Sequence, residues 1–114
     1  MTRMVGSNTN TTDTTTTTTV TINSVTATLL LAADPKRLYA RISLDSGAAS
    51  EECFIREYPA ATDNNKAGVL LTRITVGNTN LLNSEYVTLA GNIYTGEISA
   101  IAVAGSFDLH ITEG

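Results

Sequence analysis

In residues 37–44, RLYARISL, aliphatic side chains alternate at every position with arginine, tyrosine or serine side chains. The apolar members fall on one face of an extended chain: Leu38, Ala40, Ile42 and Leu44. The remaining members fall on the other face: Arg37, Tyr39, Arg41 and Ser43. Because successive side chains of a strand point to opposite faces, this segment predicts a half-buried β-strand.

Similar segments recur along the chain between clusters of Gly, Pro, Asn, Asp and Ser. They are 20–33 with a break at Asn23-Ser24, 51–58, 69–76, 85–90, 97–104 and 107–112. Asp34-Pro35 predicts a turn and Gly105-Ser106 a hairpin, whereas 59–68 and 77–84 are expected to be loops. In 85–90, we expect Val87 and Leu89 to face the core.

No segment has helical periodicity, and turn signals recur roughly every 8 to 12 residues, a spacing typical of sandwiches. The sequence therefore predicts an all-β protein. It is expected to be a single antiparallel β-sandwich of about seven or eight short strands, with an extended N-terminal arm. Jelly-roll and immunoglobulin-like strand orders both remain open.

Residues 1–19 differ in composition from the rest, since Thr, Asn and Ser dominate and Thr14–Thr19 are consecutive threonines. The sequence thus divides into a Thr-rich N-terminal arm at 1–19 and a β-sandwich domain at 20–114. A disordered tail is one interpretation of the arm, because it has few apolar groups to offset its ordering entropy. The other is an extended strand that adds to the sheet edge of a partner, since Thr favours β structure.

Charge and hydropathy exclude several kinds of partner. The net charge is −4 and the isoelectric point about 4.7, so there is no basic surface for nucleic acid. The longest apolar run, ATLLLAA, is too short to span a bilayer. We therefore expect neither nucleic-acid binding nor membrane insertion.

Catalytic constellations are also missing from the sequence. His110 is the only histidine, and Cys53 follows two glutamates that would raise the pKa of its thiol. Neither residue has a partner at metal-ligand spacing. We expect no enzyme activity, no metal and no cofactor, with Cys53 as a buried thiol and His110 on the surface. Tyr39 and Tyr86 could instead form an exposed pair that binds a glycan.

Two stretches together resemble small virion proteins of tailed bacteriophages. ATLLLAADPKRLYARISLDSG, residues 27–47, is similar to a strand that ends in an Ala-Ala-Asn/Asp-Pro turn with a basic residue after it. YTGEISAIAVAGSFDLHITEG, residues 94–114, is similar to an ending with an aromatic-Thr-Gly turn and two final strands. The resemblance implies a capsid decoration or cement protein, or a head-fibre component, located in the virion and often trimeric.

The resemblance and the β-prone arm lead to one functional hypothesis. The chain would bind a major capsid protein or another virion protein, and copies of itself as a homotrimer. The residues expected to contact a partner are those of the arm and one strand face: Thr14, Thr15, Thr16, Thr17, Thr18, Thr19, Val20, Thr21, Ile22, Arg37, Tyr39 and Arg41. A carbohydrate- or receptor-binding module of a phage tail or head fibre is the alternative.

Overall fold

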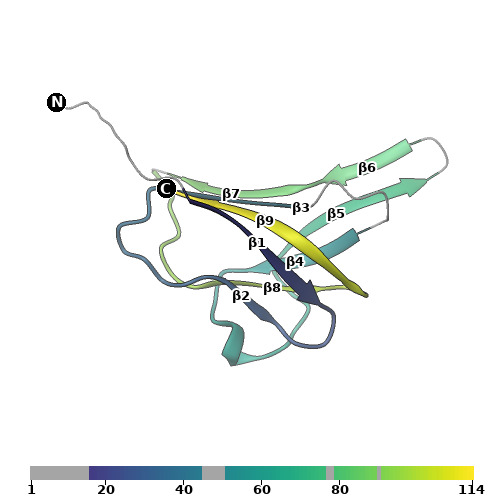
Figure 1. The fold of residues 1–114 in the computed structure, drawn as a ribbon, viewed down its shortest axis with the longest axis horizontal. Coiled ribbons are helices and arrows are strands. Elements are labelled where there is room, and N and C mark those ends of the chain that lie inside the picture. The colour runs from purple at the N-terminus through teal and green to yellow at the C-terminus, as the bar shows by residue number, and fades with distance from the viewer. Residues whose placement is uncertain (1–15, 45–50, 77–78, 90) are drawn as a thin grey trace.

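The computed structural model describes residues 16–44, 51–76, 79–89 and 91–114, and within 74–83 only the backbone. Two antiparallel sheets form a sandwich, which confirms the predicted fold class (Figure 1). The four-stranded sheet has the order β1-β9-β3-β7 and contains β1 (Thr16–Asn23), β3 (Tyr39–Leu44), β7 (Glu85–Leu89) and β9 (Ser106–Glu113). The five-stranded sheet has the order β2-β8-β4-β5-β6 and contains β2 (Thr28–Leu31), β4 (Glu51–Arg56), β5 (Val69–Val76), β6 (Thr79–Asn83) and β8 (Ile98–Ala102).

The strands pair in a nested order along the chain. β1 pairs with β9, β2 with β8, β3 with β7 and β4 with β5. This nesting is what results when one long antiparallel hairpin is rolled into two sheets, and it is the topology of a jelly roll. The structure therefore decides between the two strand orders that the sequence left open.

The hydrophobic core lies between the two sheets. The four-stranded sheet contributes buried side chains from alternate positions, among them Ile42, Leu109 and Ile111. The five-stranded sheet contributes Ile55, Leu71 and others in the same way. The alternation in 39–44 and 107–112 thus predicted correctly which of these residues face inward, but Leu38, expected on the same face, is exposed.

Short polar side chains end the strands where the sequence indicated turns. The Asn23 Oδ1 atom accepts hydrogen bonds from the backbone N–H groups of Val25 and Thr26, both at 2.9 Å, which terminates β1. Asp34 closes the turn before β3, since its backbone oxygen accepts from Arg37 N at 3.0 Å and its side chain from Lys36 N at 2.9 Å. Both predicted breaks are confirmed.

Three predictions about individual elements were wrong. Val87 and Leu89 face solvent, and Tyr86 and Thr88 are buried instead, because β7 lies in the opposite register. Part of the expected loop 77–84 is strand β6, which pairs with β5. Gly105, at a φ of 71°, does turn the chain, but it connects β8 and β9 in different sheets rather than in a hairpin.

The boundary of the sandwich also differs from the expected one. β1 begins at Thr16, and Thr16–Thr19 pair with residues 110–113 of β9. These threonines therefore belong to the domain and not to a separate arm, because the C-terminal strand of the same chain gives them a sheet edge. Thr14 and Thr15, with the rest of 1–15, lie outside the described residues.

Ile22 fixes β1 to the core, since its side chain is fully buried. We predict that Ile22→Ala lowers the free energy of unfolding by about 2 to 5 kcal/mol, because it removes buried methyl groups and leaves a cavity. Thr18→Ala in the same strand changes an exposed side chain and should cost less than about 0.5 kcal/mol. Urea unfolding of both variants tests this. Equal losses would show that β1 is not held in the core.

Candidate interaction surface

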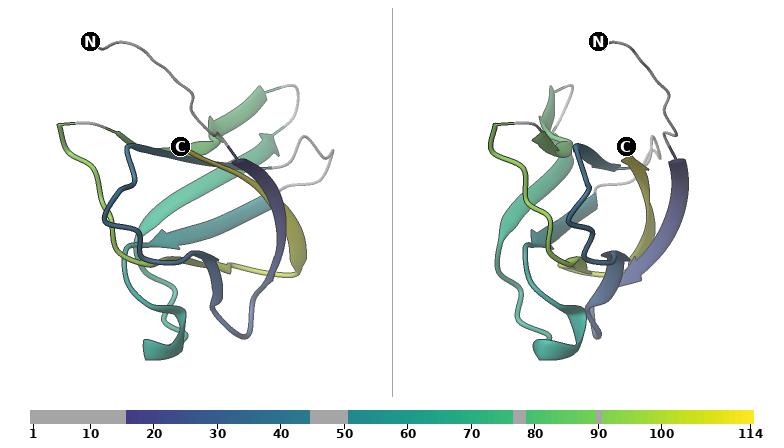
Figure 2. Two further views of the ribbon diagram at one scale, coloured as in Figure 1. Left: turned by 60° about the vertical axis from the view of Figure 1, so that its left-hand side comes forward. Right: turned by 90° about the vertical axis from the view of Figure 1, so that its left-hand side faces the viewer.

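The outer edge of β1 is a candidate interaction surface. β1 is the edge strand of the four-stranded sheet, and in the part of the chain that the structure describes no strand pairs with its other side. Figure 2 (right) shows β1 at the border of the molecule, with β9 on its inner side. The side chains of Thr16–Thr19 are all exposed.

The hydrogen-bond pattern shows which residues of β1 have backbone groups on the open edge. Tyr39 and Gly114 exchange two backbone hydrogen bonds, at 3.1 and 2.9 Å. Such pairs recur at every second residue of an antiparallel ladder. The β1–β9 and β3–β9 registers then direct the N–H and C=O groups of Thr16, Thr18, Val20 and Ile22 to β9. The N–H and C=O groups of Thr17, Thr19 and Thr21 point outward, where a further strand could pair.

Side-chain hydrogen bonds hold this edge against β9. Thr21 donates to the Asp108 carboxylate at 2.5 Å, and the Thr19 hydroxyl lies 3.3 Å from His110 Nδ1. The Thr17 hydroxyl lies 3.5 Å from that of Thr112. The threonines thus use their hydroxyls within the sheet while their outward backbone groups remain available. His110 lies on the outer sheet face, as predicted.

Of the other residues predicted to contact a partner, some lie in or against the core and others lie on the outer face of the sheet. Ile22 is buried and Val20 packs partly against the core, so neither side chain offers a contact surface. Tyr39 is half-buried, and Arg41 is exposed and paired with Glu85 at 2.7 Å. Both side chains lie on the outer face of the four-stranded sheet, as expected.

Arg37 is not on that face, which corrects the sequence prediction. Strand β3 begins only at Tyr39, so the alternation does not extend back to Arg37 and Leu38. Arg37 is 2% exposed, whereas Leu38 is 68% exposed. The residue expected to bind a partner is thus a structural residue of the interior.

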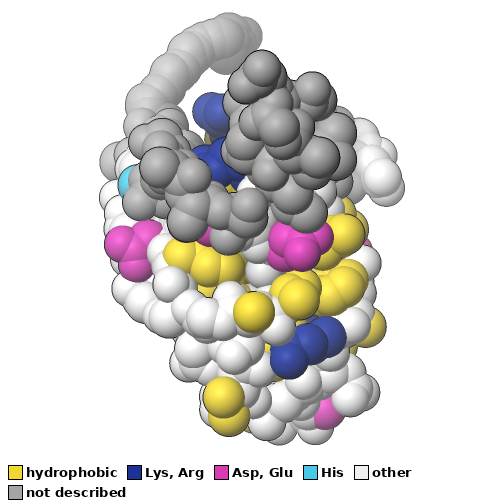
Figure 3. All heavy atoms as spheres, turned by 90° about the vertical axis from the view of Figure 1, so that its right-hand side faces the viewer, with side chains coloured by type: hydrophobic (Ala, Val, Ile, Leu, Met, Phe, Trp, Pro, Cys, Tyr) yellow, Lys and Arg dark blue, Asp and Glu magenta, His cyan; other side chains and the backbone are white. Residues whose placement is uncertain are grey.

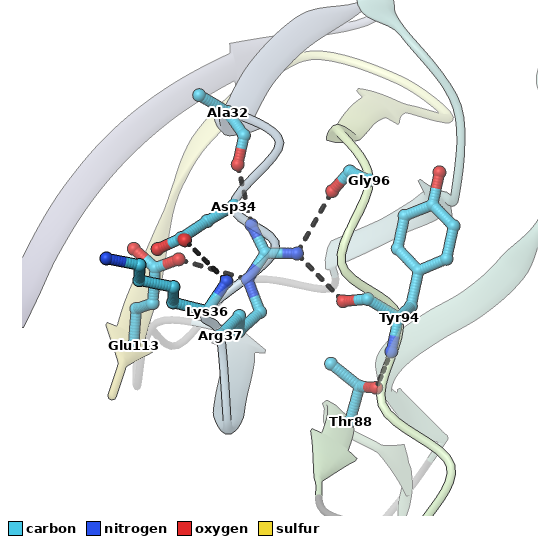
Figure 4. Close-up of polar contacts among 8 residues, drawn as sticks. All are labelled: Ala32, Asp34, Lys36, Arg37, Thr88, Tyr94, Gly96 and Glu113. Atoms are coloured by element: carbon cyan, nitrogen blue, oxygen red, sulfur yellow. Dashed lines mark hydrogen bonds and ion pairs between the residues drawn. The ribbon is translucent and has the colours of Figure 1, made fainter.

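The Arg37 guanidinium connects three segments of the chain (Figure 4). Nε donates to the Glu113 carboxylate at 3.0 Å, and NH2 donates to the Ala32 carbonyl at 2.7 Å. NH1 donates to the carbonyls of Tyr94 and Gly96 at 2.8 and 3.0 Å. These four oxygens accept from all three nitrogens of the guanidinium, so the buried charge is satisfied where it lies.

These contacts bring together the two stretches that carry the resemblance to phage proteins. Arg37 comes from the Asp-Pro-Lys-Arg turn, and Tyr94 and Gly96 come from the aromatic-Thr-Gly turn. The Asp34 N–H also donates to the Thr95 carbonyl at 2.8 Å. The two motifs therefore form one structural unit, a relation that their separation in the sequence did not reveal.

A tyrosine cluster lies at the same end of the sandwich. The Tyr86 hydroxyl donates to the Glu57 carboxylate, and the Tyr94 hydroxyl donates to the Glu57 carbonyl at 2.7 Å. Burial, and then the bond to Glu57, raises the pKa of Tyr86. Because Tyr86 is only 8% exposed, the exposed Tyr39–Tyr86 pair expected for glycan binding is not formed.

Cys53 is buried, as predicted, and its thiol is a weak acid. Burial, with the nearby charge of Glu51, raises the pKa of Cys53 to about 12. A thiolate is the reactive form of cysteine, so this thiol is protected from reaction at neutral pH.

Metal-binding clusters and membrane-spanning helices are both missing from the described residues. No group of three or more His, Cys, Asp or Glu side chains there could hold a metal ion, and no helix in that part is long and apolar enough to cross a membrane.

On the side seen in Figure 3, hydrophobic side chains gather in a broken patch beside acidic ones. Comparison with known protein families, curated proteins and solved structures finds no match to the chain.

Replacing Arg37 tests the role of its contacts. We predict that Arg37→Met lowers the free energy of unfolding by about 3 kcal/mol or more, because it leaves Glu113 and three carbonyl oxygens without their donor. Arg41→Met removes an ion pair that is exposed and should change stability little. Thermal unfolding followed by circular dichroism compares the two. A small effect of Arg37→Met would contradict a structural role.

The pKa of Cys53 predicts a loss of stability in alkali. The folded chain keeps the thiol protonated up to about pH 12, whereas the unfolded chain ionises near its ordinary value of 9.0. The free energy of unfolding should therefore be unaffected by this group below pH 9. Above it, stability should fall by up to about 1.4 kcal/mol per pH unit. Cys53→Ala should weaken this pH dependence in urea unfolding at pH 8 and 10, and an unchanged slope would contradict the assignment.

Proposed function

We propose that this chain is a non-enzymatic virion structural protein of a tailed bacteriophage. It binds the capsid surface as a decoration or cement protein and stabilises the shell by bridging subunits. The observation that carries this proposal is the open edge of β1, a threonine strand whose outward backbone groups have no partner strand among the described residues.

The open edge supports adhesion because protein chains ordinarily block such edges. Lysine, proline, bulges or covering loops prevent edge strands from pairing with other molecules. The first five residues of β1, TTTTV, contain none of these residue types, and the β1–β9 register is continuous. A strand of a capsid subunit that pairs here gains backbone hydrogen bonds to Thr17, Thr19 and Thr21.

Binding of this kind explains how a small domain could strengthen a shell. A protein that binds the assembled shell and not its separated subunits shifts the equilibrium toward assembly by mass action. Many copies, each with modest contacts, add their effects. The low charged fraction of the chain, 16%, reduces the repulsion between neighbouring copies on such a surface.

The sequence resemblance and the fold support the proposal to different degrees. The two resembling stretches contact each other through Arg37, which supports treating the resemblance as that of one part of the fold. Jelly rolls occur in viral capsid domains, but also in lectins and cupins, so the topology alone does not choose among functions.

Proline substitution in β1 tests the edge. In Thr19→Pro, the lost N–H is one that points outward, so the β1–β9 ladder stays intact while a further strand is blocked. We predict at least tenfold weaker binding to shells assembled from the major capsid protein of the same genome. Co-sedimentation measures the binding, and the unfolding midpoint should change little.

Two controls accompany this variant. Thr19→Val keeps the backbone N–H and should bind shells normally. Thr18→Pro removes an N–H directed to β9 and should lower stability. Normal shell binding by Thr19→Pro would overturn the edge mechanism, and binding of the wild-type protein to a glycan array but not to shells would favour the carbohydrate-binding alternative.

A further inference from the structure

We propose that residues 58–67, in the connection between β4 and β5, form a strap that opens as one unit while both sheets stay folded, and that the Arg56 side chain is its latch. Figures 1 and 2 show this connection extending beyond the ends of β4 and β5, with the short helix η1 (Ala60–Thr62) in its path. Opening would expose the Arg56 guanidinium, which is fully buried when the strap is closed. The inference concerns neither edge of the four-stranded sheet, so it does not rest on the proposed function.

Both ends of the strap are fixed to the sandwich. Glu57, just before it, accepts hydrogen bonds from the hydroxyls of Tyr86 and Tyr94. Gly68, just after it, has a φ of 125° and lies against the Ile55 carbonyl, since a Cβ atom at this glycine would be 2.3 Å from that oxygen. The chain between these two points can therefore move without displacing the strands that it joins.

Burial of apolar side chains does not hold the strap closed. No residue from 58 to 67 is buried, and η1 contributes none to the core. Regions with few buried apolar contacts open at a lower free energy than the core does. The strap is therefore attached by polar contacts, which water can replace when it opens.

The central polar contacts come from the Arg56 guanidinium. NH1 donates to the Asp63 carbonyl at 2.8 Å, and NH2 lies 3.2 Å from the Asp63 carboxylate and 3.4 Å from the Pro59 carbonyl. The Tyr58 ring covers the guanidinium, whose carbon is 4.1 Å from the ring centroid. All these partners belong to the strap, so the strap loses them together when it opens.

Arg56 is less well satisfied than the other buried arginine. All three guanidinium nitrogens of Arg37 donate to oxygens, at distances from 2.7 to 3.0 Å. The Nε atom of Arg56 is buried and has no acceptor among the described residues. A buried donor without an acceptor destabilises the closed state, whereas water solvates it in the open state. The free energy of opening should therefore be well below that of global unfolding.

Two further hydrogen bonds attach the strap to neighbouring segments. Ser99 Oγ in β8 donates to the Tyr58 carbonyl at 3.0 Å, and the backbone N–H of Ala27, just before β2, donates to Asn64 Oδ1 at 2.9 Å. Neither bond joins one strand to another, so losing both leaves β4 paired with β5 and β8. The Ala27 N–H also reports on the strap, because its acceptor is a strap side chain.

Opening changes the outer face of the five-stranded sheet. Arg56 and Ser99 are paired there, beside the pair of Phe54 and Ile101. Arg56, Ser99 and Ile101 are each at most 1% exposed with the strap closed. A positive charge is thus presented to solvent on this face only in the open state.

Hydrogen exchange of the wild-type chain, followed by NMR, tests whether the strap opens by itself. We expect the Ala27 amide to exchange roughly a hundredfold faster than the Ile55 amide of the central strand β4, because only global unfolding exposes the latter. Urea well below the unfolding midpoint should speed exchange at Ile55 and leave Ala27 nearly unchanged, since local opening exposes little surface. Equal rates at both amides would show that the strap opens only when the sandwich unfolds.

Replacing Arg56 tests the latch. Arg56→Met keeps an apolar stem but removes the guanidinium, and it should speed exchange at Ala27 by about tenfold or more. Trypsin should cut after Lys66, within the strap, faster by a similar factor, since cleavage follows the population of the open state. The unfolding midpoint should fall less than in Arg37→Met, because water can solvate the strap oxygens left without a donor. Arg41→Met, a matched change on the other sheet, should alter neither exchange nor cleavage.

Asp63→Asn is a milder change in the same latch. It keeps an oxygen for the Arg56 and Asn65 donors but removes the carboxylate charge, so both measurements should shift in the same direction by a smaller factor. Unchanged exchange at Ala27 in Arg56→Met would overturn the role of Arg56. A fall in the unfolding midpoint as large as that of Arg37→Met would overturn it too, since Arg56 would then hold the sandwich itself.

Discussion

The buried guanidinium of Arg37 is the interaction on which the arrangement of this jelly roll depends. It holds the connection before β3, the connection before β8 and the end of β9 in one place, because its donors meet oxygens from all three. A charge in this position is stable only when its donors are satisfied. The three segments must therefore adopt one mutual geometry, which in turn fixes β3 and β9 at the centre of the four-stranded sheet.

With its centre fixed, that sheet is left with two dissimilar edges. Hydrogen-bond alternation decides which residues are available at each: Thr17, Thr19 and Thr21 on β1, and Glu85 and Val87 on β7. One edge offers backbone groups beside hydroxyls, and the other offers them beside apolar side chains.

Much of the fold could be predicted from the sequence, because turn chemistry and alternation are local. Asn23 and Asp34 end segments by bonds to residues two or three positions away, and residues 107–112 alternate regularly. The candidate interaction surface was harder to predict from the sequence than the fold. Arg37 looked like an exposed strand residue, since its partners Tyr94, Gly96 and Glu113 are distant in the chain. β7 has apolar residues on both faces, Tyr86 and Val87 among them, so its pattern did not fix its register. The strand pairing of Thr16–Thr19 depends on β9, which no local pattern identifies as their neighbour.

The pairing of the first and last strands has a consequence for how the chain folds. Thr17 and Thr112 are neighbours in space although 95 positions separate them. During synthesis from the N-terminus, β1 is made first and has no partner strand until β9 has left the ribosome. Closing so long a loop is entropically costly, and folds rich in distant contacts form slowly. We therefore expect the nascent chain to pass through a period in which its threonine strand has two free edges.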